Sequence, residues 1–179
     1  MIFRPTQIAG VWLIEAERIA DERGHFARTY DAGEFAERGL EAAIAQCSVS
    51  FNARAGTLRG LHYQAEPHAE AKLVRCTRGA IHDVALDLRP DSPTYLDSYA
   101  AELSAENGSA LFVPAGCAHG FQTLVADSEV GYQISVPYIP GAARGVRWDD
   151  PAFAIDWPDP PPGGRTMSAR DAAFPDYQR

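Results

Sequence analysis

Residues 56–76 read GTLRGLHYQAEPHAEAKLVRC, two β-rich runs joined by a break rich in Glu, Pro and Ala. The two runs bring Arg59, His62 and Lys72 close together in sequence. Such residues are most often solvated cations or a hydrogen-bonded core histidine. A base, an ammonium and a guanidinium on neighbouring strands would also suit proton removal next to a carbonyl group. The rest of the chain has to distinguish these two interpretations.

The chain around this stretch is typical of short strands. In residues 46–52 (QCSVSFN) apolar and polar side chains alternate, as in a strand with two unlike faces. Only one or two helical turns are predicted, beginning at Asp31. Many short strands with little helix favour an all-β sandwich or jelly-roll barrel. The remaining predicted strands cover residues 11–14, 25–30, 57–63, 71–77, 80–88, 94–103, 110–113, 119–125 and 129–136.

Strict alternation creates a difficulty in residues 58–64. It places His62 on one face of its strand and Arg59 on the other. A β-bulge at Gly60 would re-aim one side chain and let both residues share a pocket. Lys72 has the parity of Val74 and Cys76, so its ammonium is expected in an apolar environment, where it needs a partner or a purpose.

Composition limits the class of protein. A chain of 179 residues with 46% hydrophobic residues predicts a single domain, 1–179. The net charge of −8 argues against nucleic-acid and membrane-surface binding, so an anionic ligand needs a local basic pocket. Neither a leader pattern nor a long apolar run is evident, which predicts a cytoplasmic protein. The Pro-rich stretch at 156–164 leads to a C-terminal segment, about 156–179, predicted to pack on the barrel.

A second motif points to a cupin-like barrel. PAGCAH at 114–119 has the P-x-G-x-x-H form of the second cupin motif. The H-x-H of the first cupin motif is absent, because Tyr63 and Gln64 follow His62. A cupin metal site needs three or four convergent ligands, and only His119 stands in a matching place. We therefore predict a metal-free, cupin-like jelly-roll barrel with a few short helices at its periphery.

Seven motifs in order then give a specific resemblance. They are LRGLHYQ (58–64), KLVRCTRGAIHDVALDLR (72–89), SPTY (92–95), LSAEN (103–107), VPAGCAHGF (113–121), YQISVPY (132–138) and RGVRWDDP (144–151). Together they resemble the dTDP-4-dehydrorhamnose 3,5-epimerase family. The resemblance implies a homodimer without metal or cofactor that acts on a nucleotide-diphosphate 4-keto-6-deoxy sugar. It further implies that the N-terminal strands, about 1–30, are exchanged with the partner subunit.

The resemblance also implies roles for individual residues. His62 matches the catalytic base, Asp171 the carboxylate that orients it, Tyr132 the proton donor and Lys72 the residue at the C4 keto oxygen. The remaining matches are substrate-binding positions, of which Arg23 and Phe26 are lent by the partner: Arg59, His119, Tyr138, Gln46, Ser48, Arg23 and Phe26.

Several alternatives stay open at this point. Ser168 and Asp171 resemble a helix capping pair, which would give Asp171 a structural role. Tyr132 alternates with Val130 and Ile134, so it could be a core tyrosine. The reaction could invert C3, C5 or both, and the chain could instead be a non-catalytic sugar-nucleotide binder or a metal-dependent cupin. The sequence departs from the family pattern at Arg28, Ser48 and Ala143. These departures leave open whether the nucleotide is dTDP or another, such as CDP.

Overall fold

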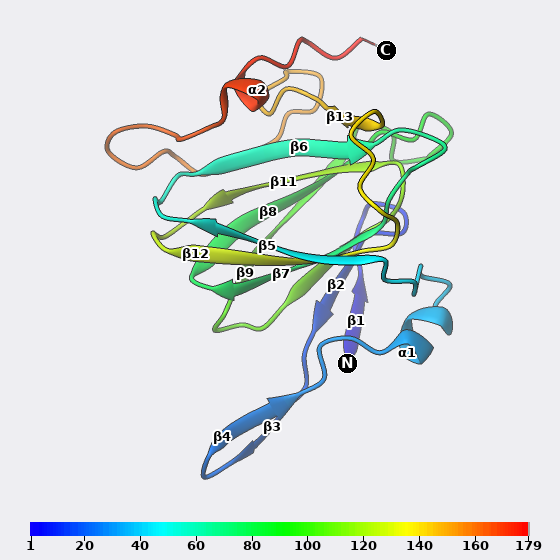
Figure 1. Cartoon of the computed structure of the whole chain (residues 1–179), viewed down its shortest axis with the longest axis vertical. Helices are drawn as coiled ribbons and strands as arrows, with labels where there is room; N and C mark the ends of the chain where they lie inside the picture. The colour runs from blue at the N-terminus through cyan, green and yellow to red at the C-terminus, as the bar shows by residue number, and fades with distance from the viewer. Residues whose placement is uncertain (179) are drawn as a thin grey trace.

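The computed structural model describes residues 1–178, which form two antiparallel sheets packed face to face (Figure 1). Thirteen strands and two short helices are present among these residues. The prediction of an all-β, cupin-like fold with little helix is confirmed. The last residue of the predicted C-terminal segment, 179, lies outside the described residues.

The larger sheet has six strands, in the order β1-β2-β10-β7-β12-β5. Its strands β7 and β12 carry Lys72 and Tyr132, whose side chains point into the space between the two sheets. The strand bounds are β1 Ile2–Pro5, β2 Trp12–Glu15, β10 Ala110–Val113, β7 Lys72–Arg78, β12 Ser128–Ile134 and β5 Gln46–Asn52. Residues 2–5 were not predicted as a strand.

The smaller sheet has five strands, in the order β13-β6-β11-β8-β9. Its strands are β13 Ala143–Gly145, β6 Leu58–Gln64, β11 Cys117–Thr123, β8 Ala80–Asp87 and β9 Ser98–Ser104. An apolar core that includes Val74, Leu111, Phe121 and Val130 fills the space between the two sheets. Burial of this apolar surface is the main force that holds the sheets together.

A β-bulge interrupts the pairing of β6 with β11. His62 pairs with His119 and Arg59 pairs with Phe121, so three steps on β6 match two steps on β11. Gly60 has a φ of 134°, and a Cβ atom there would lie 2.6 Å from the Cα of Gly120. Only glycine fits this conformation and this close approach. The predicted bulge is present, and it turns Arg59 and His62 toward the same side of the sheet.

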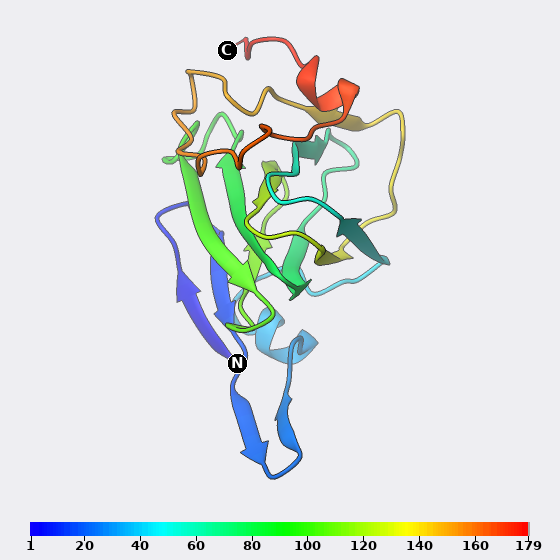
Figure 2. The ribbon, with the colours of Figure 1, turned by 90° about the vertical axis from the view of Figure 1, so that its left-hand side faces the viewer.

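The N-terminal hairpin projects away from the two sheets (Figures 1 and 2). It consists of β3, Arg18–Asp21, and β4, Gly24–Ala27, with Arg23 in the turn. Ile19 and Phe26 are exposed on it. The helix α1, Ala32–Ala36, follows and is N-capped by Asp31, whose carboxylate accepts hydrogen bonds from two backbone amides. The sequence predicted β4 and the helix start but not β3.

The C-terminal segment lies against the five-stranded sheet (Figure 1). Trp157 packs on the apolar cluster that covers the outer face of this sheet, and Arg165 donates a hydrogen bond to Gln122 of β11. The short helix α2, Ala169–Ala172, follows and contacts β6. No described helix is long and apolar enough to cross a membrane. The cytoplasmic location stays a prediction.

Candidate active site

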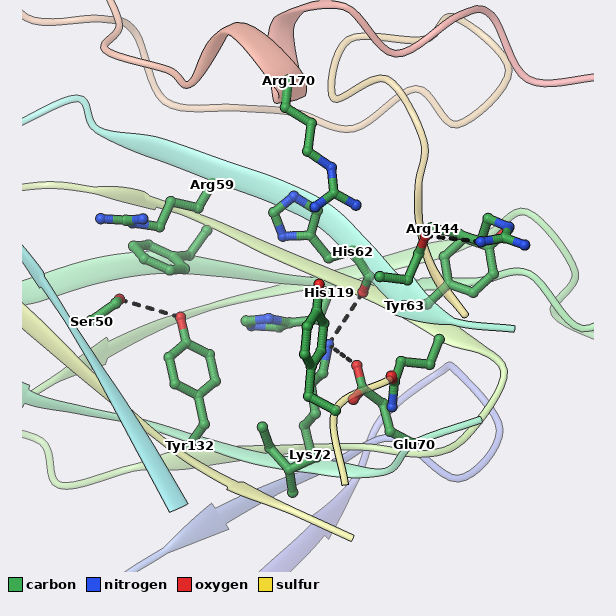
Figure 3. A pocket seen from close by; sticks show the side chains of 15 residues that line it. Ser50, Arg59, His62, Tyr63, Glu70, Lys72, His119, Tyr132, Arg144 and Arg170 are labelled. Carbon is green, nitrogen blue, oxygen red and sulfur yellow. Dashed lines mark hydrogen bonds and ion pairs between the residues drawn. The ribbon is translucent and has the colours of Figure 1, made fainter. Parts of the chain in front are cut away.

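A cavity of about 310 Å³ opens between β6 and β11 of one sheet and β7 and β12 of the other (Figure 3). His62, Lys72 and Tyr132 reach it from three different strands. The full lining consists of Ser50, Arg59, His62, Tyr63, Gln64, Glu70, Lys72, His119, Phe121, Tyr132, Ile134, Tyr138, Ala143, Arg144 and Arg170.

His62 is paired with Asp171 from α2. Its Nε2 lies 2.8 Å from Asp171 Oδ1, and Asp171 Oδ2 accepts a hydrogen bond from the Gly60 amide. Burial by itself would raise the pKa of Asp171, but the hydrogen bonds from His62 and Gly60 lower it below its usual value. A carboxylate at Nε2 places the ring proton there and leaves Nδ1 with a free lone pair. His62 can therefore accept a proton.

Asp171 also takes part in the helix cap that the sequence suggested. Ser168 Oγ accepts a hydrogen bond from the backbone amide of Asp171, at 3.0 Å. The cap uses the main chain of Asp171, and its carboxylate remains free to bind His62. The capping and the orienting interpretations of Asp171 therefore apply together.

Lys72 points into the cavity from the start of β7, on the apolar side that its parity predicted. Its Nζ lies 2.6 Å from Glu70 Oε1 and donates a hydrogen bond to the backbone oxygen of His62 at 3.3 Å (Figure 3). Both side chains of the ion pair are almost buried. A fixed ammonium in such a site stabilises a developing oxyanion more than it could in water.

Tyr132 lies on β12, and its hydroxyl is 3.5 Å from Ser50 Oγ. Burial raises the pKa of this phenol well above its usual value, since the phenolate would lose its hydration. The phenol therefore stays protonated at neutral pH and can donate a proton. Its ring packs edge-on against His119, with centroids 6.0 Å apart. Tyr132 is thus a cavity residue, not only a core residue.

His119 forms the second histidine–carboxylate pair of the cavity. Its Nε2 lies 2.8 Å from Asp83 Oδ1 on the neighbouring strand β8. Both side chains are buried, and Asp83 Oδ2 has no hydrogen-bond partner among the described residues. This pair is fixed by the sheet itself.

Cationic side chains give the acidic chain a local positive site. Arg59 lines the cavity while its Nε donates to Asn52 Oδ1 at 2.7 Å. Arg144 and Arg170 lie at the cavity in Figure 3, on β13 and α2. Guanidinium groups bind phosphate oxygens well because their donors form a planar fork. The cavity can therefore take an anionic ligand.

The other predicted binding residues lie at the edge of the cavity or outside it. Tyr138 lines the cavity and is exposed, and its backbone amide donates to Gln46 Oε1 at 2.8 Å. Ser48 borders a separate cavity next to Leu73 and Arg75. Within this single chain Arg23 and Phe26 sit on the projecting hairpin, away from the cavity. Of the three departures from the family pattern, Ala143 lines the cavity and Arg28 pairs with Asp31.

Sequence reasoning missed several residues of the site. Glu70 and Asp83 are buried acids bound to predicted residues, and Ser50, Arg144 and Arg170 line the cavity. The EAK spacing at 70–72 was an available signal for Glu70. Between residues 1 and 178, no group of three or more His, Cys, Asp and Glu side chains could hold a metal ion. Metal-free and cofactor-free chemistry stays a prediction.

Comparisons with known proteins agree with this geometry. The dTDP-4-dehydrorhamnose 3,5-epimerase family profile matches residues 5–179. The chain is 48% identical to the dTDP-4-dehydrorhamnose 3,5-epimerase of Sinorhizobium fredii, over 88% of this chain and 81% of the relative. The structure of that enzyme from Elizabethkingia anophelis superimposes with a TM-score of 0.94 at 36% identity, over 99% and 96% of the two chains. The enzyme from Bacillus anthracis, solved with TDP and PPi bound, gives a TM-score of 0.93 at 38% identity, over 98% and 99%. The chain belongs to the dTDP-4-dehydrorhamnose 3,5-epimerase family.

Proposed function

We propose that this cavity inverts C3 and C5 of dTDP-4-keto-6-deoxyglucose, with His62 as base, Lys72 at the keto oxygen and Tyr132 as acid. The observation that carries the proposal is that these three side chains, from three strands of two sheets, line one cavity. A base, an oxyanion donor and an acid around one small space are what epimerisation next to a ketone requires.

The chemistry follows from the ketone at C4. Both C3 and C5 are adjacent to the carbonyl, so removal of either proton gives an enolate whose charge lies on the C4 oxygen. His62 takes the proton, and the carboxylate of Asp171 keeps the imidazole in the tautomer that can accept it. The Lys72 ammonium stabilises the enolate oxygen. Tyr132 returns a proton to the opposite face of the carbon, which inverts the centre.

The nucleotide end is proposed to lie toward the arginines and Tyr138. Arg59 and Arg170 suit the diphosphate, and the exposed ring of Tyr138 offers a surface for a nucleotide base. The Bacillus anthracis relative binds TDP and PPi, which supports dTDP as the nucleotide. His119 completes the sugar pocket beside Tyr132.

We also propose that the protein works as a homodimer in which the N-terminal segment, about 1–30, reaches the partner subunit through its hairpin, while β1 and β2 stay paired in this chain's own sheet. Two apolar surfaces of the single chain are exposed: Ile19 and Phe26 on the hairpin, and Val49 and Phe51 on the outer face of β5. Soluble monomers rarely expose such large apolar side chains together. A partner subunit would cover them, and Arg23 at the hairpin turn would then reach the partner's cavity.

Hydrogen exchange tests the reaction. The protein is incubated in D₂O with dTDP-4-keto-6-deoxyglucose, and the C3–H and C5–H signals are followed by NMR. Loss of both signals with formation of the rhamno product supports the proposal. Loss of one signal means a single-site epimerase, and no loss with this substrate or its CDP analogue means a non-catalytic binder. Loss of activity with a chelator would contradict metal-free chemistry.

Subunit mixing tests the exchanged hairpin. Arg23→Ala and His62→Ala homodimers are each expected to be nearly inactive. When the two variants are mixed one to one and exchange subunits, half of the dimers are hybrids. Each hybrid has one site with both an intact His62 and an intact partner Arg23, so about a quarter of the wild-type rate should return. Light scattering checks the dimer mass. No recovery in a mixture that has exchanged subunits would overturn the shared site.

A further inference from the structure

We propose that Glu70 is a positioning residue that holds the Lys72 ammonium in place for the keto oxygen. This inference deepens the proposed function and rests on it. The Lys72 Nζ to Glu70 Oε1 distance is 2.6 Å, and the two side chains are only 10% and 7% exposed. Figure 3 shows the contact between the Lys72 ammonium and the Glu70 carboxylate, with His62 above it in the view.

Glu70 is an unexpected residue in this place. Among the described residues that line the cavity it is the only acid, and four cations, Arg59, Lys72, Arg144 and Arg170, line the same space. A carboxylate in a cavity for a diphosphate sugar opposes ligand binding unless its charge is compensated. Its contact with Lys72 compensates the charge, and it also gives the buried ammonium the partner that its desolvation requires.

The hydrogen-bond geometry defines what Glu70 does to Lys72. An ammonium has three N–H donors. One meets Glu70 Oε1 and a second meets the backbone oxygen of His62 at 3.3 Å. A single donor is left for the substrate. Because the second bond goes to the main chain of His62, the ammonium is also held at a fixed place relative to the catalytic base.

The backbone around Glu70 is itself fixed. The amide of Ala71 donates to Ser135 Oγ at 2.9 Å, and the amide of Ser135 donates to the Ala71 oxygen at 3.0 Å. Glu70 lies two residues before Lys72, the first residue of β7, and both side chains line the cavity. Lysine has four rotatable side-chain bonds, and the carboxylate restricts them before substrate arrives. This is preorganisation of the oxyanion donor.

Glu70→Leu and Glu70→Gln form a matched pair that tests this role. Both keep about the same volume, but only glutamine retains an oxygen that can accept a hydrogen bond from Lys72. We expect Glu70→Leu to lower kcat for C5–H exchange at least thirtyfold while KM and the Kd of dTDP change less than threefold. Glu70→Gln should lose less than tenfold. Glu70→Ala gives a second non-accepting variant if the leucine variant does not fold, and thermal unfolding monitors all of them.

A double-mutant cycle distinguishes positioning of Lys72 from any other role. In a Lys72→Met background, Glu70→Leu should change the residual exchange rate less than twofold, because its target is gone. The same thirtyfold loss in that background would overturn the inference, as would a wild-type kcat for Glu70→Leu. If the wild-type protein exchanges neither proton, the proposed function fails and the inference falls with it. Wild-type exchange with an unaffected Glu70→Leu variant contradicts the inference alone.

Discussion

Two histidines that line the same cavity, His62 and His119, are each paired with an aspartate, and the two pairs differ in how they are held. The His62 and His119 pairs have the same N···O distance, 2.8 Å. The side chain of His62 is 38% exposed, whereas that of His119 is 5% exposed. Asp171 comes from the C-terminal helix, while Asp83 lies on the strand next to His119. The two histidines therefore have hydrogen bonds of the same length but differ in solvent exposure and in the element that supplies the aspartate.

The difference indicates that the His62 pair serves the reaction, whereas the His119 pair mainly serves the structure of the cavity. A base must reach its substrate, and only the accessible imidazole of His62 can do so freely. The buried His119 pair, with Tyr132 packed against it, forms the wall of the cavity next to the proposed acid. The orientation of His62 depends on a segment more than one hundred residues away in sequence, whereas that of His119 depends on local strand pairing. Mutations in the two pairs should therefore separate activity from stability.

The largest effect is expected for His62→Ala. Without the proposed base, exchange at C3 and C5 should fall by about 10³- to 10⁴-fold. The NMR exchange assay in D₂O measures it, and dTDP binding by calorimetry should persist because the nucleotide is proposed to bind toward the arginines and Tyr138. His119→Ala is the matched variant of the other pair and should lose a smaller factor. Equal losses of exchange would break the proposed division.

Asp171→Asn should lower exchange by about 10²-fold or more, because the amide NH₂ can stabilise the wrong imidazole tautomer. The unfolding temperature should fall less than in Asp83→Asn, since the helix cap uses the backbone of Asp171 and the amide keeps an oxygen that can accept from the Gly60 amide. The pKa of Asp171 lies below its usual value, so its carboxylate is already ionised from pH 5 to 8. Asp171 itself therefore does not titrate in that range, and the variant should stay slower than the wild type at every pH from 5 to 8. A variant that matches the wild-type rate anywhere in that range would speak against the orienting role.

Asp83→Asn should lower stability more than it lowers the rate of hydrogen exchange, the reverse of Asp171→Asn. Asp83 is fully buried, and loss of its charge-assisted bond to His119 should lower the free energy of unfolding by about 2–3 kcal/mol. Exchange by the folded variant should fall less than tenfold, because the base is untouched. Urea denaturation followed by circular dichroism gives the stability. A stable variant with a hundredfold slower exchange would show that the buried pair takes part in proton removal.

Local patterns predicted much of the fold and part of the site. Alternation located most strands, and Gly60 signalled the bulge because no other residue fits there. Parity placed Lys72 on the inner face. The same alternation in β5 did not reveal that its apolar residues Val49 and Phe51 would be exposed, since alternation shows two unlike faces but not which one meets the core.

The partners of the site residues were harder to predict. Asp83 meets His119 only because β8 pairs with β11, and strand order is not encoded in local spacing. Asp171 could be linked to His62 through family resemblance alone, because its own sequence context resembles a helix cap. Glu70 lies only two residues before Lys72 in the sequence, but it was not predicted as a site residue because neighbouring charged side chains are usually solvated. Burial, which separates these cases, is a property of the tertiary structure.

Tyr132→Phe should have the smallest effect on exchange. It tests the proposed acid, whereas the variants above test the two histidine–aspartate pairs. In the proposed mechanism, proton removal by His62 does not need the phenol, so exchange should stay within about threefold of wild type while inversion falls about tenfold or more. In the wild type the pKa of Tyr132 is raised by burial, so the phenol keeps its proton up to at least pH 10. The ratio of inversion to exchange should therefore remain constant from pH 7 to 10. A ratio that declines between pH 8 and 10, or equal loss of both processes in the Phe variant, would place the acid on another residue.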